Sequence, residues 1–460
     1  MAQKRTNDLG RDPVGPLLFR LALPTVTAQL VNALYNIVDR MYIGHIQGVG
    51  DLALTGLGVC FPVIMFVSAI SALVGVGGGS RAVVRMGEGK TDQANAILGS
   101  CATLLVILAL AVTVILQLVK RPMLLLFGAT ENTIGYAMDY LTIYLSGTLF
   151  VELSLGLNFF ITSQGFSTIS MGTVLIGAVT NIVLDPIFIF GLNMGVKGAA
   201  LATITAQAVS AVWVLRFLTG KRTKLRLQRE YAKVDFKVLA PVLALGAAPF
   251  IMQSTESLVN ICFNSSLKAY GGDPAVGAMT ICSSVIQVFF LLLQGVAQGA
   301  QPIVGFNYGA GNLDRVRKAF RLLVTCDLIF GVAAWLAVEL FPGVFVALFN
   351  NKPELVEIAV WTLRVYAGGM FMLGLQSACQ QTFVALGQAK LCLFMALLRK
   401  IILLIPLIYL IPMFLENKVL AVFLAEPAAD FLAVAITGLT FLYHFPRILK
   451  QREEELKKAD

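Results

Sequence analysis

The chain has 460 residues, of which 57% are hydrophobic and only 13% charged, and its mean hydropathy is +0.81. Soluble domains carry about 25% charged residues, so this composition excludes a soluble globular protein and indicates a membrane protein with many spans. The net charge is +9, but the basic residues are not gathered on one face as nucleic-acid binding requires. We therefore expect no nucleic-acid partner.

Motifs for enzyme chemistry are missing from the sequence. The seven cysteines stand singly in apolar segments, without a Cys-x-x-Cys pair, and the two histidines are far apart. Neither a disulfide framework nor a zinc site is supported. The stretch VGVGGGS (Val74–Ser80) lacks the lysine and hydroxyl of a phosphate-binding loop, so it predicts close helix packing instead. We expect no cofactor and neither an enzyme nor an ATP-driven pump.

Apolar runs of about 20 residues or more, each long enough to cross a bilayer as a helix, occur twelve times. The first six are expected at residues 17–43, 52–80, 93–119, 133–162, 169–190 and 198–218. A basic stretch at 220–237 forms the longest break. Six further runs follow at 238–267, 276–306, 319–341, 356–385, 391–415 and 419–445. This pattern predicts an all-α membrane protein with an N-terminal lobe (1–219), a cytoplasmic linker (220–237) and a C-terminal lobe (238–460).

The loops after these runs indicate an internal repeat. Four residues in the first half have an identical residue 222 positions later: Gly87 and Gly309, Gly89 and Gly311, Asp92 and Asp314, and Gly165 and Gly387. Each half holds six runs, an even number, so both copies have the same orientation. We predict two six-helix lobes related by a pseudo-two-fold axis along the membrane normal, a plan found in transporters.

Loop charges predict the orientation, because cytoplasmic loops carry an excess of lysine and arginine. The Lys221–Lys237 cluster and the charged carboxyl-terminal tail fall on the same side as Arg81 and Arg85, and the other side has few basic residues. Both termini are therefore expected in the cytoplasm. The first run is too long for the core of a signal peptide and is expected to remain as a helix.

Ionisable side chains at bilayer depth cost about 2.5–3.5 kcal/mol on insertion scales, and by default they mark a binding or proton-relay site. Asn181 and Asp185 are four residues apart, so on a helix they share one face. Pro186 follows and frees a backbone carbonyl one turn back. Thr203, in the sixth run, has a hydroxyl at a depth that could meet Asp185. We interpret this stretch as half of an ion-coupling site.

A further acid, Asp39, lies in the first run, with Asn36 one turn before it. Two structural alternatives stay open: Asp39 pairs with Arg40 at the interface, or Asp185 caps a helix or turn. Adjacent helix residues do not face each other, which argues against the first.

Other acids also lie in apolar runs, namely Glu152, Glu256, Asp327, Glu426 and Asp430. Arg399 and Lys400 could neutralise Glu426 or Asp430. Glu256 is the best candidate for a second site, because it follows Pro249, which matches Pro24 of the first run.

The stretches MGEGKTDQANAI, DPIFIFG and G-x-x-G-A-A-x-A-T (Gly195–Thr203) resemble the multidrug and toxic compound extrusion (MATE) family, in the bacterial branch that includes relatives of DNA-damage-inducible protein F. The resemblance covers nearly the whole chain. It implies a two-lobe antiporter that exports organic cations and similar drugs in exchange for protons or sodium. By motif, the family's N-lobe cation site corresponds to Asp39, Asn181, Asp185 and Thr203, whose oxygens suit a proton or a sodium ion. Asn36 and Glu256 are accessory candidates.

The expected partners are small-molecule drugs and the lipid bilayer, for a monomer that crosses the plasma (inner) membrane many times. The same two-lobe plan also resembles lipid-linked oligosaccharide flippases. Those proteins usually carry more cationic residues in a central cavity, for which only Arg399 and Lys400 are candidates here. A membrane receptor or structural protein without transport is the remaining alternative.

Overall fold

The computed structural model describes residues 7–349 and 353–459, and these residues form helices and no strands. Ten of the described helices are long and apolar enough to cross a membrane, and the bent pair α4 (Ile134–Ser146) and α5 (Thr148–Ser163) makes one further span, with 58° between its halves. α8 (Phe236–Gly309) has 74 residues and breaks at Gly272, where φ is 65°, so it holds two spans. Twelve spans result. The predicted fold class, an all-α membrane protein with twelve spanning helices in two lobes, is confirmed.

The described chain forms two compact units. Unit 1 contains Thr27–Phe250 with the segment that ends at Asp8, and unit 2 contains Leu9–Val26 and the chain from Ile251 onward. α1 (Val14–Gly44) and α8 therefore each contribute to both units. α1 passes from one unit to the other close to Pro24, and α8 does so close to Pro249. The lobe boundaries predicted from the basic stretch stay a prediction.

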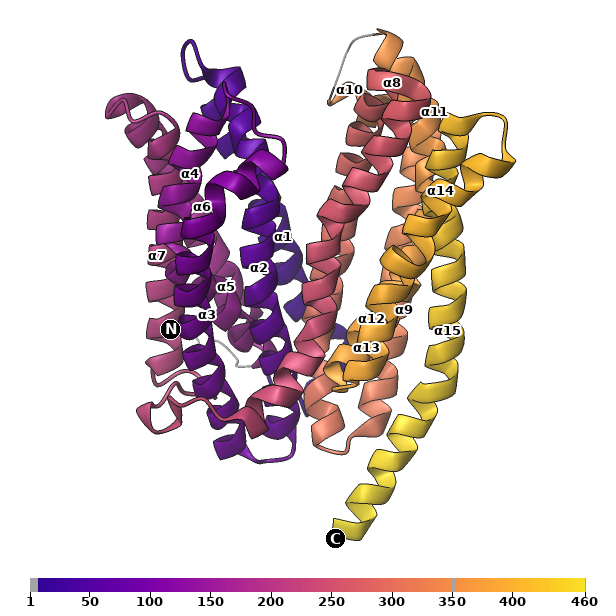
Figure 1. Cartoon of the computed structure of the whole chain (residues 1–460). Helices are drawn as coiled ribbons and strands as arrows, with labels where there is room; N and C mark the ends of the chain where they lie inside the picture. Colours follow the sequence, from indigo (N-terminus) through magenta and orange to yellow (C-terminus); the bar gives the residue numbers. More distant parts are fainter. Residues whose placement is uncertain (1–6, 350–352, 460) are drawn as a thin grey trace. The chain divides into compact units, whose positions relative to one another are not determined.

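Unit 1 is built from long helices that follow one another along the chain (Figure 1). Besides its parts of α1 and α8 and the pair α4 and α5, it contains α2 (Gly50–Gly87), α3 (Thr91–Leu126), α6 (Ser167–Pro186), the π-helix η1 (Ile187–Gly191), α7 (Val196–Thr219) and the short 3₁₀-helix η2 (Arg229–Tyr231).

Small residues of α2 allow the helices of unit 1 to pack closely. A Cβ atom on Gly77 would overlap the carbonyl oxygen of Val242 in α8, and one on Gly78 would lie 2.8 Å from the Sγ of Cys101 in α3. The close packing predicted for Val74–Ser80 is thus confirmed, since only glycine lets these backbones approach so far.

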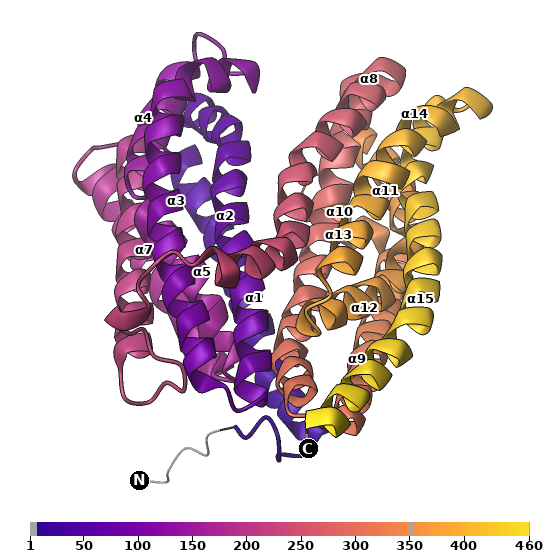
Figure 2. The ribbon, with the colours of Figure 1, turned by 60° about the horizontal axis from the view of Figure 1, so that its bottom comes forward.

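The segment between α7 and α8 folds back on unit 1 (Figure 2). Its backbone N–H groups at Lys224 and Leu225 both donate to the Oε1 of Gln164 at 2.8 Å, and that of Arg226 donates to the Oδ1 of Asn95 at 2.9 Å. The basic stretch predicted as a linker is therefore anchored to the ends of α3 and α5.

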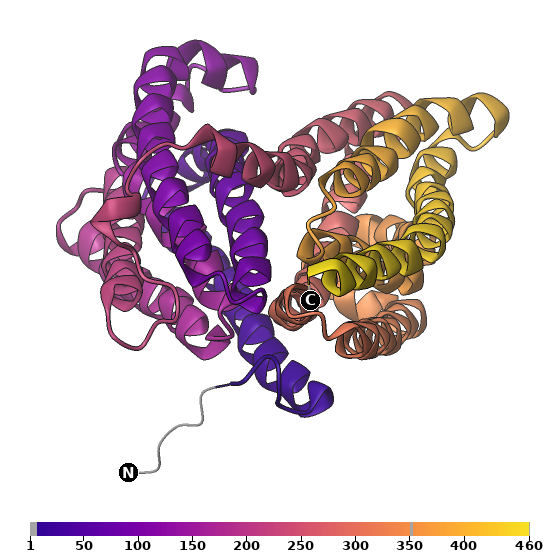
Figure 3. The same cartoon turned by 90° about the horizontal axis from the view of Figure 1, so that it is seen from below.

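Unit 2 contains the remaining helices, and Figure 3 shows α15 (yellow) running along the orange helices of this unit. The elements are α9 (Leu313–Leu340), α10 (Pro342–Ala347), α11 (Pro353–Tyr366), the 3₁₀-helix η3 (Ala367–Met372), α12 (Leu373–Ala385), α13 (Ala389–Leu397), the π-helix η4 (Leu398–Leu404), α14 (Ile405–Phe414) and α15 (Lys418–Ala459). Phe441 of α15 stacks on Phe320 of α9, with 4.3 Å between ring centroids, and contacts Phe383 of α12 at 4.9 Å.

The repeat found in the sequence extends to the backbone. Gly89 and Gly311 follow α2 and α8 with φ of 74° and 76°, and Gly165 and Gly387 follow α5 and α12 with φ of 87° and 73°. This left-handed conformation ends helices and favours glycine. Corresponding helices in the two halves of the chain therefore end with the same turn.

We predict that Gly77→Ala lowers the stability of the purified protein by about 1–3 kcal/mol, because the added methyl group overpacks the contact with Val242. Thermal denaturation in detergent measures this change. Gly58→Ala is the matched control in the same helix, since nothing lies within 4 Å of a Cβ there. Equal melting temperatures for the two variants would show that this helix contact does not limit stability.

Candidate ion-binding site

The helix that carries Asn181 and Asp185 changes its geometry just after them. α6 ends at Pro186 and continues as π-helical η1, in which the N–H of Leu192 donates to the carbonyl of Ile187 at 2.8 Å, five residues back. Proline lacks the N–H of a regular turn, and π-bulges occur often at functional sites. Asp185 lies in the last turn of α6, so the alternative in which it caps the start of a helix is wrong.

Three of the predicted site residues are in direct contact. The amide nitrogen of Asn181 donates to the Oδ1 of Asp185 at 3.3 Å and to the hydroxyl of Thr203 at 3.4 Å, and all three side chains are buried. α7 brings Thr203 to this position because Gly198 allows a close approach: a Cβ on it would lie 2.7 Å from the carbonyl carbon of Phe188 in η1. The structure thus brings the Thr203 hydroxyl to Asn181, and the part that Thr203 plays with Asp185 stays a prediction.

Asp39 completes the group from α1. Its side chain is buried, and its carboxyl lies within hydrogen-bonding reach of the Asp185 carboxyl. Two carboxyl groups can hydrogen-bond to each other only when one of them holds a proton. Arg40 is instead placed over the ring of Phe61, 5.6 Å from its centroid, and no ion pair with Asp39 occurs in the described chain. The alternative Asp39–Arg40 pair is therefore not supported.

The cluster formed by Asp39, Asn181, Asp185 and Thr203 contains oxygen atoms that could bind a ligand. Asp39 Oδ1, Asn181 Oδ1 and Asp185 Oδ2 are buried and have no hydrogen-bond partner among the described residues. A buried polar atom without a partner costs about 1–3 kcal/mol. Oxygen atoms of this kind are the ligands that hard cations prefer. The residues thus fit a proton shared by the carboxyls or a sodium ion held by carboxylate, amide and hydroxyl oxygens.

Two tyrosines at this site escaped the sequence analysis. The hydroxyl of Tyr140 in α4 is hydrogen-bonded to that of Thr203, and its ring stacks on Tyr144, one turn later, at 6.1 Å. Tyr35 of α1 lies near both Asp39 and Asp185. The sequence contained a signal for Tyr35, because this residue precedes Asp39 by four positions and therefore shares its helix face.

The two accessory candidates are not brought to this site. Asn36 is exposed, and its amide donates to the carbonyl of Asn32 at 2.7 Å, within its own helix. Glu256 belongs to unit 2, where it forms an ion pair with Lys400. Their participation in coupling stays a prediction.

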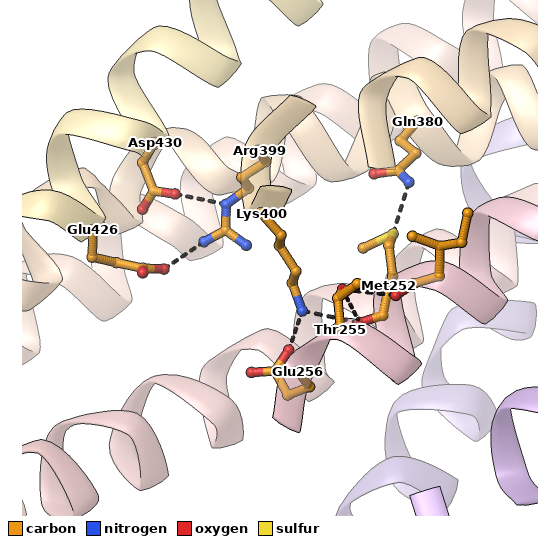
Figure 4. A network of polar contacts seen from close by, with 9 residues as sticks. Met252, Thr255, Glu256, Gln380, Arg399, Lys400, Glu426 and Asp430 are labelled. Atoms are coloured by element: carbon orange, nitrogen blue, oxygen red, sulfur yellow. Dashed lines mark hydrogen bonds and ion pairs between the residues drawn. The ribbon is translucent and has the colours of Figure 1, made fainter. Parts of the chain in front are cut away.

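Unit 2 contains a separate network of charged side chains on α8, η4 and α15 (Figure 4). Arg399 donates from Nη2 to Glu426 at 2.8 Å and from Nε to Asp430 at 2.7 Å, as predicted for this arginine. Lys400 does not reach either acid. Its ammonium group contacts Glu256 and the carbonyl of Met252, the latter at 3.1 Å.

Two further acids are fully buried in the packing of their own unit. In unit 1 the hydroxyl of Ser71 donates to Glu152 at 2.8 Å. In unit 2 both oxygens of Asp327 lack a hydrogen-bond partner among the described residues.

Comparison with known proteins gives consistent matches. The model of the MatE family matches residues 24–187 and 249–410. The multidrug export protein MepA of Staphylococcus haemolyticus (strain JCSC1435) is 25% identical over 422 residues, which cover 91% of this chain and 92% of that protein. MepA of Staphylococcus aureus (strain MRSA252) is 24% identical over 405 residues, 87% of this chain and 88% of that one.

Among solved structures, that of the MATE multidrug transporter DinF-BH is 33% identical, with a TM-score of 0.88, and covers 97% of this chain and 99% of that chain. The outward-facing conformation of a multidrug resistance MATE family transporter of the MOP superfamily is 22% identical, with a TM-score of 0.89 over 98% of this chain and 100% of that chain. The second likeness concerns the fold alone.

We predict that Thr203→Val lowers the stability of the purified protein by about 1–3 kcal/mol, because it leaves Asn181 and Tyr140 with an unpaired polar group in a buried site. Thermal denaturation provides the measurement. Thr205→Val is the control two residues away, since among the described residues that hydroxyl bonds only to the carbonyl of Leu201 in its own helix. The described hydrogen bonds would be contradicted by a Thr203→Val protein as stable as the control.

Proposed function

This chain belongs to the MatE family, and from that premise and the geometry of its site we propose that it is a multidrug efflux transporter that exchanges organic cations and similar drugs for protons or sodium ions. The observation that carries the coupling is the convergence of Asp39 and Asp185, with unpartnered oxygens, on one buried group in unit 1.

Charge compensation explains how this group can drive a conformational change. With a proton or a sodium ion bound, the negative charge of the carboxyl pair is compensated. The helices α1, α6 and α7 can then stay packed around it. Once the ion leaves, two buried like charges remain, which is strongly unfavourable in an apolar interior. The helices must then separate the carboxyls or expose them to water.

α1 links this change to the rest of the chain. The helix carries Asp39 in unit 1, whereas its part before Thr27 belongs to unit 2. Displacing Asp39 therefore acts along a continuous helix on a segment of the other unit. We infer that ion release at the site changes the access of the drug by this route, as alternating access requires.

The driving force is adequate for drug accumulation outside the cell. One elementary charge that moves down 100 mV releases about 2.3 kcal/mol. Because about 1.4 kcal/mol corresponds to a factor of ten, one such charge supports a gradient of roughly fifty-fold for a drug without net charge. A concentration gradient of the ion adds to this. One-for-one exchange with a monovalent organic cation moves no net charge, so there the concentration gradient of the ion provides the driving force.

The long apolar helices and the family make this a multi-pass membrane protein. We propose that it lies in the plasma (inner) membrane as a monomer, with both termini and the linker in the cytoplasm. Export is favoured over the flippase alternative because the relatives are drug exporters. In addition, Arg399 and Lys400, the cations a flippase would need, are already engaged by carboxylates of unit 2.

We predict that Asp39→Asn and Asp185→Asn each reduce drug efflux to the level of cells without the protein, because an amide cannot take up and release the coupling proton or balance a sodium ion. The accumulation of a fluorescent organic cation in cells measures this loss, with membrane insertion checked by the amount of protein in the membrane fraction. Asp51→Asn is the control, since this acid is exposed at the start of α2. Full export by either site variant would refute the coupling role.

The coupling ion is identified in everted vesicles. We predict that drug uptake at a fixed proton gradient either continues without sodium, as for a proton coupled through the carboxyl pair, or stops, as for a sodium ion at the same oxygens. Uptake that persists after both gradients are removed would contradict antiport.

A further inference from the structure

Glu152 of α5 is a buried acid that the proposed exchange at Asp39 and Asp185 does not use. The residue is 0% exposed, and its Oε2 accepts a hydrogen bond from the hydroxyl of Ser71 in α2 at 2.8 Å. Its Oε1 is buried and has no hydrogen-bond partner among the described residues. A single hydroxyl group is thus the hydrogen-bond partner that the described chain gives to this carboxyl group.

No cation compensates a charge on Glu152 in the described structure. The elements packed against α5 are α2, α3, α4, α6 and α7. α2 presents Ser71, and α4 presents the phenol of Tyr144, which lies near enough for a charge on Glu152 to act on it. Among the described residues, no charged side chain from these helices acts on Glu152. An ionised carboxylate without a partner is very costly in such an interior, so Glu152 holds a proton.

Close packing of α2 and α5 encloses this proton on one side. Gly75 follows Ser71 by one turn, and Gly156 follows Glu152 by one turn. A Cβ atom on Gly75 would lie 2.6 Å from the carbonyl oxygen of Gly156, so the two backbones are in contact there. Leu157, next to this contact, is fully buried in an apolar cluster. Water can therefore reach Glu152 from this side only when α2 and α5 separate.

α5 begins at a bend that is in contact with the candidate ion site. α4 and α5 meet at 58° around Gly147, five residues before Glu152. A Cβ atom on Gly147 would lie only 2.3 Å from the side chain of Ile204 in α7, and Ile204 directly follows Thr203 of the ion site. A displacement of α7 at the ion site therefore acts directly on the bend from which α5 carries Glu152.

A carboxyl group has one property at this position that an amide of the same shape lacks. A glutamine could accept the same hydrogen bond from Ser71, so contact between α2 and α5 does not by itself require an acid. Only the acid can release and take up a proton. Ionisable side chains at bilayer depth are costly, and by default they mark a functional site.

We propose that Glu152 is a second proton-binding residue of unit 1, which releases its proton when α2 and α5 separate at Gly75 and Gly156. This inference rests on the proposed function. In the release step the O–H bond of Glu152 breaks, the electron pair stays on the carboxylate and the proton passes to water. Uptake of a proton from water reverses the step before the helices close. Each drug molecule is then exchanged for one proton in addition to the ion bound at Asp39 and Asp185.

The number of protons exchanged per drug molecule is measured at a balance point. Purified protein in sealed liposomes receives ethidium on both sides, equal sodium concentrations and a fixed pH difference, while valinomycin and equal potassium concentrations keep the membrane potential at zero. The ethidium ratio at which no net flux occurs rises tenfold for each pH unit and each exchanged proton. We expect Glu152→Gln to balance at a ratio ten times smaller per pH unit than the unchanged protein. Glu131→Gln, an exposed acid of the same unit, is expected to keep the ratio.

A Glu152→Gln protein that balances at the ratio of the unchanged protein would overturn the inference. A residue that only holds α2 and α5 together changes the rate of transport and not the balance point. Should this variant not reach the membrane, Ser71→Ala combined with Glu152→Leu replaces it, because removal of both partners leaves neither one buried and unpaired. The same tenfold difference is expected, and an unchanged ratio would again overturn the inference.

The proposed function fails by a different result. Ethidium flux in the unchanged protein that responds neither to a pH difference nor to a sodium difference would contradict antiport altogether. If the carboxyl pair of unit 1 binds sodium, the balance point of the unchanged protein still moves tenfold per pH unit, and that of Glu152→Gln moves with sodium alone. A balance point of the unchanged protein that moves with sodium and not with pH would overturn the role of Glu152 and leave antiport intact.

Discussion

Asp39 and Asp185 lie within hydrogen-bonding reach of each other at bilayer depth, and a carboxyl pair in that position must hold a proton or another cation between its oxygens. The local structure of unit 1 serves this requirement. Pro186 and the π-helix η1 end the regular turn just after Asp185. Gly198 lets α7 approach so that Thr203 supplies a hydroxyl from a third helix and accepts a hydrogen bond from Asn181 of α6. Each of these features is costly in a membrane helix, and together they support the proposed role of this group in ion coupling.

The two units meet the problem of buried charge in different ways, although the chain repeats. Unit 1 surrounds its carboxyl pair with amide, hydroxyl and phenol groups, and no ion pair joins Asp39 to the neighbouring Arg40 in the described structure. Unit 2 places Arg399 and Lys400 on a π-helix and pairs them with acids from α8 and α15. At the offset of the repeat, Asp185 corresponds to the apolar Leu407. The repeat therefore preserves helix ends, such as the turns at Gly89 and Gly311, while the polar chemistry has diverged.

Local patterns predicted the parts of this structure that depend on neighbouring residues in the sequence. Apolar length gave the twelve spans, and the four-residue spacing of Asn181 and Asp185 gave their shared face. Contacts between distant helices were harder to predict, because periodicity shows which face of a helix is polar but not which helix lies opposite. Tyr140 was missed and Lys400 was assigned to the wrong acid for this reason. The part that Asn36 plays stays a prediction, since the structure shows only that its amide bonds to the backbone of its own helix. The division of α1 and α8 between the two units could not be predicted from the sequence, in which only Pro24 and Pro249 mark these positions.

We propose that drug movement and ion movement are obligatorily linked through the carboxyl pair of unit 1. The most direct measurement uses purified protein in sealed liposomes, where an imposed gradient of an organic cation is the only driving force. If the account is correct, drug that flows down its gradient drives protons or sodium ions in the opposite direction, detected with an internal pH indicator or with radioactive sodium. Drug flux with neither ion moving would contradict it.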